Sequence, residues 1–275
     1  MPLFDASINQ SRPDRCVTVR TLHVRGKRTP ARWLACAVPL ALAFALAAGA
    51  AGAASSASLG GQLAPILTAG PRECPRIALT FDLCPASHEP GFDAALVRWL
   101  IEHRVPATFF ASGRWIARHP EPLAELAAVP FFELGTHGAR HLHLPTLGEE
   151  AQRAELSGAI EALASRTGRR PTLFRPPYGE YDRTTLGLAE SLGQRVVMWD
   201  VVSGDPSPDL SARHMWATVE SQAEPGSIVI FHANGNGHHT LEVAERVVTE
   251  LVPRRGWELV TVSEVVAGCE PAAAP

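Results

Sequence analysis

The chain has 275 residues, of which 46% are hydrophobic and 19% are charged, and its formal net charge at pH 7 is -3. This composition supplies enough apolar sequence for one sizeable core and excludes an intrinsically disordered chain. The near-neutral balance, with an isoelectric point of about 6.4, provides no basic surface for nucleic acid, so we predict no nucleic-acid partner.

An apolar run near the N-terminus has the pattern of an export signal. Residues 33–54 (WLACAVPLALAFALAAGAAGAA) follow a basic cluster that includes Arg25 and Arg32, and small residues close the run. The run is also long enough to cross a bilayer, although Pro39 and the many small residues weaken that alternative. We predict that residues 1–54 are a signal peptide or an N-terminal membrane anchor. The protein is then exported, either periplasmic or extracellular, with anchoring to the inner membrane as the alternative to cleavage.

Residues 55–75 are rich in Ala, Ser, Gly and Pro without periodicity, which is typical of a linker. We predict a folded domain at 76–268 and a C-terminal tail at 269–275. Three of the five cysteines lie beyond the export segment: Cys74, Cys84 and Cys269. In an oxidising compartment, a disulfide between Cys74 and Cys269 would join the two ends of the domain, and three free thiols are the alternative.

From Arg76 onward, short apolar runs rich in β-branched residues alternate with longer amphipathic stretches. Seven runs are predicted as strands: RIALTF, ATFFAS, FFELGT, TLFR, VVMWD, SIVIFH and ELVT. Helices are predicted at residues 92–104, 119–128, 149–166, 182–192, 210–222, 240–252 and 262–267. These seven βα units predict an α/β fold with a parallel sheet, closed as a barrel or open and doubly wound. The first strand is not followed by G-x-G-x-x-G or a Walker loop, so nucleotide chemistry loses its main support.

Ionisable or polar side chains stand at the predicted carboxyl ends of five strands. They are Asp82, His137, His141, Arg175, Tyr178, Asp200, Asp205 and His232. Each alone has an ordinary interpretation, such as a solvated loop histidine or a helix-capping aspartate. Together they indicate an active site, because the carboxyl ends of parallel strands meet on one face of the domain.

Two histidines of GTHGARHLHLP, His137 and His141, have i, i+4 spacing. On a helical turn this spacing points both imidazoles the same way and suits a divalent metal ion of the zinc type. A catalytic zinc needs a third protein ligand beside its open position. The segment 82–84 (DLC), at the first strand end, is the candidate source of that ligand.

Five motifs in this order resemble those of the polysaccharide deacetylases of carbohydrate esterase family 4, which share the NodB-homology domain. They are TFDLCP (80–85), HGARH (137–141), RPPYG (175–179), WDVVSGDP (199–206) and IVIFHANG (228–235). The resemblance covers residues 76–266, and the T-F-D-L-C first motif indicates a subgroup of the family. It implies a distorted (β/α)7 barrel that removes N- or O-linked acetyl groups from a glycan. It also implies a divalent metal ion, zinc first, with cobalt and manganese as alternatives.

The resemblance also implies roles for individual residues. Asp82 would be the general base and His232 the general acid. Arg175 would orient Asp82, and Asp205 would tether His232. Tyr178 would stabilise the oxyanion through its backbone N–H. The implied metal ligands are His137 and His141. The residues that we expect to contact the substrate are Pro176, Pro177, Trp199 and Asn234. A carboxylate base and an imidazolium acid beside a Lewis-acidic metal supply the groups that amide or ester hydrolysis needs.

The first motif departs from the family at the position of a metal ligand. Leu83 stands where the family has the second aspartate of T-F-D-D-G-P, and leucine cannot bind a metal ion. Two neutral imidazoles bind a divalent ion far more weakly than the same pair with a carboxylate. Three replacements stay open: Asp82, the thiolate of Cys84, or a swing of His88 or Glu89 from the following loop. The ordinary interpretation of such a cysteine is a small buried side chain.

Two classes of function fit these residues. The first is a metal-dependent hydrolase that deacetylates peptidoglycan, chitooligosaccharide or an exopolysaccharide, with hydrolysis of small non-peptide amides as a variant. The second is a catalytically inactive glycan-binding module that keeps the barrel and has lost the metal, which Leu83 favours. The joint presence of the base, the acid and their two orienting residues favours the hydrolase.

Overall fold

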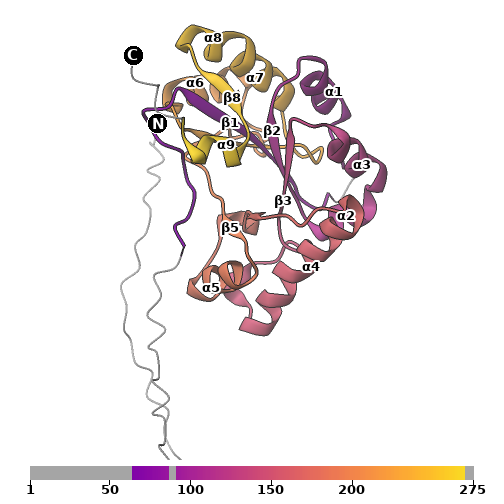
Figure 1. The fold of residues 1–275 in the computed structure, drawn as a ribbon. Helices are drawn as coiled ribbons and strands as arrows, with labels where there is room; N and C mark the ends of the chain where they lie inside the picture. Colours follow the sequence, from indigo (N-terminus) through magenta and orange to yellow (C-terminus); the bar gives the residue numbers. More distant parts are fainter. Residues whose placement is uncertain (1–63, 87–90, 270–275) are drawn as a thin grey trace, which may run out of the picture. The chain divides into compact units, whose positions relative to one another are not determined.

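The computed structural model describes residues 64–86 and 91–269 (Figure 1). The predicted signal or anchor segment, the linker up to residue 63, and the candidate ligands His88 and Glu89 lie outside the described residues. Within the described ranges, none of the helices combines the length and apolar character that a membrane span requires.

The described strands form one eight-stranded sheet in which every strand pair is parallel. Its strands are β1 (Arg76–Leu83), β2 (Ala107–Ala111), β3 (Phe132–Thr136), β4 (Leu173–Phe174), β5 (Arg195–Val196), β6 (Val201–Val202), β7 (Ile228–His232) and β8 (Glu258–Val260). The spatial order is β5-β4-β3-β2-β1-β7-β6, and β8 pairs with β1. The α/β fold with a parallel sheet that the alternation predicts is therefore confirmed.

The sheet curls into a half-barrel because its two outermost strands are close neighbours in sequence. In a flat sheet, β5 and β6 would lie six strand spacings apart, about 29 Å. The four residues 197–200 that connect them can span at most about 18 Å even when fully extended. The sheet must therefore curve until these edges approach each other, which gathers the carboxyl ends of its strands around one mouth.

Helices cover the outside of this curled sheet (Figure 1). They are α1 (Ala94–Glu102), α2 (Gly113–Arg118), α3 (Pro120–Ala128), α4 (Glu149–Thr167), α5 (Arg183–Ser191), α6 (Ala212–Gln222), α7 (Thr240–Arg246), α8 (Val252–Arg255) and α9 (Val262–Ala267). The seven predicted helices are confirmed, the sixth continuing from α7 through a π-turn into α8. The sequence does not predict the short α2, because six residues are too few for a periodic signal. Ser112 caps this helix by accepting a hydrogen bond from Trp115 N.

Strand β1 shows how the sequence divides the two faces of the sheet. Successive side chains of a strand point to opposite faces. Leu79, Phe81 and Leu83 belong to the large apolar cluster that the helices cover, and Leu83 is fully buried there. Ala78 belongs instead to the cluster inside the curled sheet, and Asp82 shares that inner face at the mouth.

The fifth predicted strand, VVMWD, is split in the structure. Leu67 forms a parallel bridge with Val197 between β5 and β6, and Met198 N donates to Leu67 O at 2.8 Å. Asp200 consequently precedes β6 and lies at the amino end of the sheet, where it pairs with Arg72 at 2.8 Å. The expectation that Asp200 belongs to the active-site face is therefore wrong, because the strand begins after this residue and not before it.

The later part of the predicted linker packs against the domain. Leu67 is buried, and Gly70 N donates to Gly226 O at 2.7 Å. Cys74 forms a disulfide with Cys269, with their Cα atoms 5.5 Å apart, which decides between the two alternatives for these cysteines. Residues 67–74 therefore pack with the folded domain, ahead of the boundary placed at Arg76.

Candidate active site

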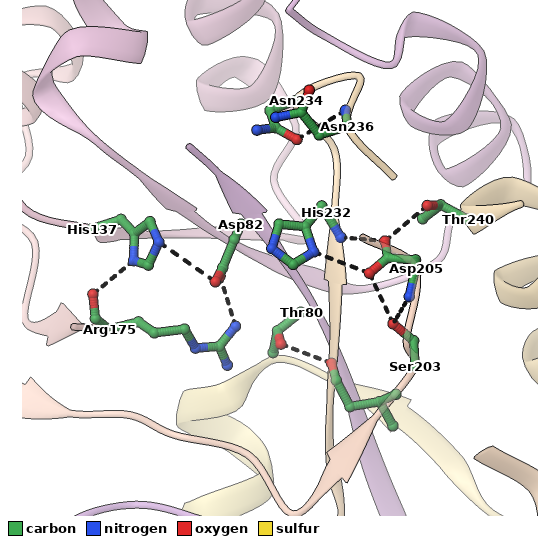
Figure 2. Close-up of polar contacts among 11 residues, drawn as sticks. Thr80, Asp82, His137, Arg175, Ser203, Asp205, His232, Asn234, Asn236 and Thr240 are labelled. Carbon is green, nitrogen blue, oxygen red and sulfur yellow. Dashed lines mark hydrogen bonds and ion pairs between the residues drawn. The ribbon is translucent and has the colours of Figure 1, made fainter. Parts of the chain in front are cut away.

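Asp82 lies at the carboxyl end of β1 and is 3% exposed. Its Oδ1 accepts a hydrogen bond from Nη1 of the fully buried Arg175 at 2.8 Å (Figure 2). The guanidinium of Arg175 lies over the rings of Phe110 and Trp199, at 4.1 and 5.4 Å from their centroids. The second oxygen, Oδ2, is 3.6 Å from Nε2 of His137. Arg175 thus holds one carboxylate oxygen of Asp82 in place while the other faces the histidine.

His232 ends β7 and is fixed by Asp205. Its Nδ1 is 3.0 Å from Asp205 Oδ1, and its backbone N–H donates to Oδ2 at 2.7 Å. The hydroxyls of Ser203 and Thr240 donate to the same carboxylate at 2.9 and 2.8 Å. Because an ionised carboxylate can only accept, Nδ1 of His232 carries a hydrogen, which leaves Nε2 for the pocket. Figure 2 shows Asp82 between the rings of His137 and His232.

His137 and His141 converge on the same mouth, although no helical turn lies between them. Residues 137–143 form a loop in which Gly138 and His141 have left-handed backbone angles, with φ of 70° and 66°. The buried Glu155 of α4 holds this loop, because its carboxylate accepts hydrogen bonds from Arg140 N and Nε at 2.8 and 2.6 Å. The two imidazole centroids end 4.8 Å apart. The loop geometry, and not helical spacing, brings these rings together.

A Cys/His donor set in this mouth fits a divalent metal ion. Ligand atoms of Cys84, His137 and His141 all lie within 4.8 Å of one another. Nδ1 of His137 lies 2.8 Å from the carbonyl oxygen of Arg175 and must donate to it, which leaves Nε2 as the ligand atom. Ligating histidines usually donate their other ring N–H to a carbonyl or carboxylate in this way. The chemistry of the donor set therefore fits the divalent metal ion that the resemblance implies.

The charges around the site shift the pKa values of Asp82 and His232 in opposite directions. Burial alone would raise the pKa of Asp82, but the nearby positive charges, Arg175 first, hold that pKa below its usual value. Burial alone would lower the pKa of His232, but its hydrogen bond to Asp205 and neighbouring negative groups raise that pKa well above its usual value. The directions of these two pKa shifts favour the ionised form of Asp82 and the protonated form of His232.

The same balance acts on the donor set. Burial would raise the pKa of the Cys84 thiol, but the charge of His137 and hydrogen bonds from the surrounding imidazoles lower that pKa well below its usual value. Burial would lower the pKa of His137, but Asp82 and Cys84 raise it. The negative groups that stabilise a proton on His137 also attract a metal cation in its place.

A pocket of about 480 Å³ opens at this mouth. The predicted site residues that line it are Asp82, His137, His141, Tyr178, Trp199, Asp205, His232 and Asn234. Arg175 lies behind Asp82. Pro176 and Pro177 are buried and are not among the lining residues, and their contact with substrate stays a prediction.

Tyr178 and Asn234 occupy different positions in the pocket wall. Tyr178 is 54% exposed, and its ring stacks on that of His143, with centroids 4.0 Å apart. Asn234 is fully buried, and its amide donates to the carbonyl of Cys84 at 3.2 Å while accepting from Asn236 N. The side chain of Asn234 therefore supports the loop after β1, whereas Tyr178 offers an aromatic surface at the rim.

Comparison with known proteins finds relatives that share the fold and part of the sequence of this chain. Residues 69–197 match the family model described as polysaccharide deacetylase. An uncharacterised protein of Streptomyces coelicolor is 38% identical over 185 residues, which cover 66% of this chain and 70% of that protein. This chain belongs to the polysaccharide deacetylase family.

Relatives in the polysaccharide deacetylase family differ in length and in what their names state. A bifunctional xylanase/xylan deacetylase of Cellvibrio japonicus is 30% identical over 176 residues, covering 64% of this chain but only 25% of that protein. A peptidoglycan-N-acetylglucosamine deacetylase of Bacillus cereus is 28% identical, covering 70% of this chain and 69% of that protein. This chain thus spans a quarter of one named relative and about two thirds of the other.

Solved structures of the family include active and inactive members. The Bc1960 peptidoglycan N-acetylglucosamine deacetylase superposes with a TM-score of 0.68 at 25% identity, covering 74% of this chain and 94% of that one. BA3943 of Bacillus anthracis, described as a pseudoenzyme, has a TM-score of 0.66 at 21% identity, covering 74% and 69%. Both share the curled parallel sheet, and the second likeness concerns the fold alone.

The sequence leaves Cys84 open as one of three candidate replacement ligands, because the pattern does not distinguish a metal ligand from a small buried side chain. In this structure Leu83 packs in the large apolar cluster while Asp82 faces the mouth. The convergence of Cys84 with two histidines from another loop appears only in the tertiary structure.

Proposed function

We propose that this protein is an exported, metal-dependent deacetylase that removes acetyl groups from a cell-envelope polysaccharide. The observation that carries the proposal is the pairing of Asp82 and His232 in one pocket. One is a carboxylate held by a buried arginine, and the other is an imidazole held by a buried aspartate. These are the two proton-transfer groups that hydrolysis of an acetamide requires.

The residues divide the reaction between them. Oδ2 of Asp82 takes a proton from the water that attacks the acetyl carbonyl, and Arg175 keeps the carboxylate ionised and oriented. Nε2 of His232 gives a proton to the leaving nitrogen as the carbon–nitrogen bond breaks. The products are acetate and a free amine. For an O-linked acetyl group, the leaving atom is the sugar oxygen.

Tyr178 contributes its backbone N–H to the carbonyl oxygen that becomes negative during the attack. It lies in the single turn Pro177–Gly179, where Tyr178 has a left-handed φ of 60° and the first N–H groups have no partner within the turn. Such donors stabilise an oxyanion without reorganising. A divalent ion held by His137 and His141 would act there as a Lewis acid, polarising the acetyl carbonyl and making water a stronger nucleophile.

Peptidoglycan is the substrate that we place first, with chitooligosaccharide and exopolysaccharide behind it. The named relatives include peptidoglycan deacetylases, which supports this order. Tyr178 and Trp199 offer aromatic surfaces beside the pocket on which a sugar ring can lie. The disulfide between Cys74 and Cys269 supports an exported location, because such bonds persist in oxidising compartments.

One observation favours a second candidate, a glycan-binding module without catalysis. Leu83 packs among the helices and contributes nothing to the donor set, so the carboxylate ligand of the family's first motif is absent. Two imidazoles alone would hold a divalent ion weakly. The module would then keep the pocket and its aromatic rim but lack a bound ion.

Acetate release separates the two candidates. The full chain, supplied with zinc, would be incubated with peptidoglycan and with acetylated chitooligosaccharide, with and without a chelator. The deacetylase predicts acetate release that the chelator abolishes and that His137→Ala reduces at least about 100-fold. Absence of acetate release from a folded, zinc-supplied protein on every glycan offered would establish the binding module in its place.

A further inference from the structure

The donor set of this chain contains a sulfur atom. Cys84 Sγ groups with ring nitrogens of His137 and His141, and no carboxylate of the described residues joins that group. Leu83, at the family's aspartate position, is fully buried in the outer core. The side chain that joins the two histidines is therefore Cys84, one position after the family's aspartate position.

Resting on the proposed deacetylase function, we infer that Cys84 is the third metal ligand and binds as a thiolate. The site is then a Cys-His-His centre. A thiolate with two imidazoles selects zinc or cobalt, whereas manganese and magnesium favour oxygen ligands. The exchange of ligand therefore changes which metal ion the protein uses.

The backbone around Cys84 is fixed from three directions, as a ligand requires. Ala233 N donates to the carbonyl of Asp82 at 3.1 Å, and Ser112 donates to the carbonyl of Leu83 through both N and Oγ, at 3.2 and 3.1 Å. The side chain of Asn234 donates to the carbonyl of Cys84 at 3.2 Å. The residues that directly follow β2 and β7 thus hold three successive peptide groups, so the thiol reaches the mouth at little entropic cost.

The surroundings of Cys84 argue against a packing role. A cysteine that fills space is usually surrounded by apolar side chains. Cys84 belongs to none of the apolar clusters of the described chain and lines the pocket beside three imidazoles, those of His137, His141 and His232. Its sulfur therefore lies where an ion would be bound and not where a methyl group would serve equally well.

Asp82 is a weaker candidate for the third ligand. Its Oδ1 is already bound by Arg175, and the carboxylate is not part of the converging group. Ligation by Asp82 would also remove the base on which the proposed reaction depends. Cys84 supplies negative charge to the ion and leaves Asp82 free for proton transfer.

Cobalt absorption tests this ligand directly, because thiolate bound to Co²⁺ gives an intense near-ultraviolet charge-transfer band that oxygen and nitrogen ligands do not give. The full chain would carry Cys16→Ser and Cys36→Ser, so that Cys84 is its one cysteine outside the disulfide. The metal-free protein is titrated with Co²⁺. The matched variants are Cys84→Ser, which keeps the size of the side chain, and Cys84→Asp, which offers a carboxylate.

We expect the band to saturate at one Co²⁺ per chain. Cys84→Ser loses the band and binds Co²⁺ at least about tenfold more weakly, whereas Cys84→Asp loses the band but recovers binding, including binding of Mn²⁺. Circular dichroism of each variant confirms that it is folded. The inference is overturned if Co²⁺ does not bind, binds stoichiometrically without the band, or gives an equal band in Cys84→Ser.

Acetate release from the same samples separates this inference from the function on which it rests. If the band depends on Cys84 but the protein releases no acetate, Cys84 is a metal ligand and the proposed deacetylase function is rejected. If acetate release is chelator-sensitive but bound Co²⁺ shows no band, the deacetylase function is supported and the assignment of Cys84 as a ligand is rejected.

Discussion

The mouth of the curled sheet holds two buried carboxylates that are bonded in opposite ways. Asp205 accepts four hydrogen bonds, from two groups of His232 and from the hydroxyls of Ser203 and Thr240. Asp82 is held through one oxygen by Arg175, and its other oxygen faces His137 across 3.6 Å. A carboxylate with every lone-pair direction occupied positions its neighbours, whereas one with a free oxygen can take up a proton.

This difference predicts that the two aspartates fail differently when they are replaced. Loss of Asp82 should remove catalysis and spare the fold, provided that the bond to Arg175 is kept. Loss of Asp205 should reduce both catalysis and stability, because a network of buried donors loses its common acceptor.

The largest expected effect is on catalysis by Asp82→Asn. The amide keeps an oxygen for Arg175 but cannot act as a base, so kcat should fall about 1,000-fold, within the range for a lost general base. Acetate release and the thermal midpoint would be measured together. Asp82→Ala is the control for packing, because it leaves the guanidinium unpaired and should cost about 3 kcal/mol of stability in addition. Unchanged acetate release in Asp82→Asn would exclude Asp82 as the base.

Asp205→Ala is expected to reduce stability and activity together. Four donors lose their acceptor, two of them on His232, and the free energy of unfolding should fall by about 3 kcal/mol. Denaturant unfolding measures this loss, and acetate release should fall at least about 100-fold because the His232 ring is no longer held. A fully stable Asp205→Ala variant would show that the four hydrogen bonds do not support the mouth.

Thr240→Val removes a single one of those hydrogen bonds at nearly constant size. Thr240 is 2% exposed, and its hydroxyl donates to Asp205 Oδ2 at 2.8 Å. The free energy of unfolding should fall by about 1 kcal/mol, and kcat should fall several-fold without a change in KM. Thr240→Ser, which keeps the hydroxyl, should restore kcat. If the serine variant is as slow as the valine variant, the hydroxyl does not act through Asp205.

The smallest effect concerns Asp182, a carboxylate outside the mouth that caps α5. It accepts from Thr185 N at 2.8 Å, and hydrogen bonds from Thr185 and Gln152 hold the pKa of Asp182 below its usual value despite the opposing effect of burial. Because the folded pKa is lowered, the stabilisation is present above the unfolded pKa and is lost as the pH falls through the folded one. Asp182→Ala should cost about 1 kcal/mol at neutral pH and less near pH 2, with acetate release unchanged. A pH-independent cost would refute the charged cap.

Much of the fold could be predicted, because long apolar runs and helical periods are local signals. The prediction of Asp82 and His232 also rests on a local signal, a polar residue at the end of an apolar strand. It fails at Asp200, since only the bridge between Leu67 and Val197 shows that this strand is interrupted. The order of the motifs predicts that the site lies at the carboxyl ends of the strands, but it does not predict which site residues contact one another.

The sequence by itself determined the α/β alternation, the family and the strand ends that carry ionisable groups. The tertiary structure alone decided that Cys84 meets His137 and His141, that Asn234 supports the Cys84 loop, and that Cys74 joins Cys269. The physical reason is range. Periodicity and strand alternation act over a few neighbouring residues, whereas these contacts join loops and chain ends that only the curvature of the sheet brings together.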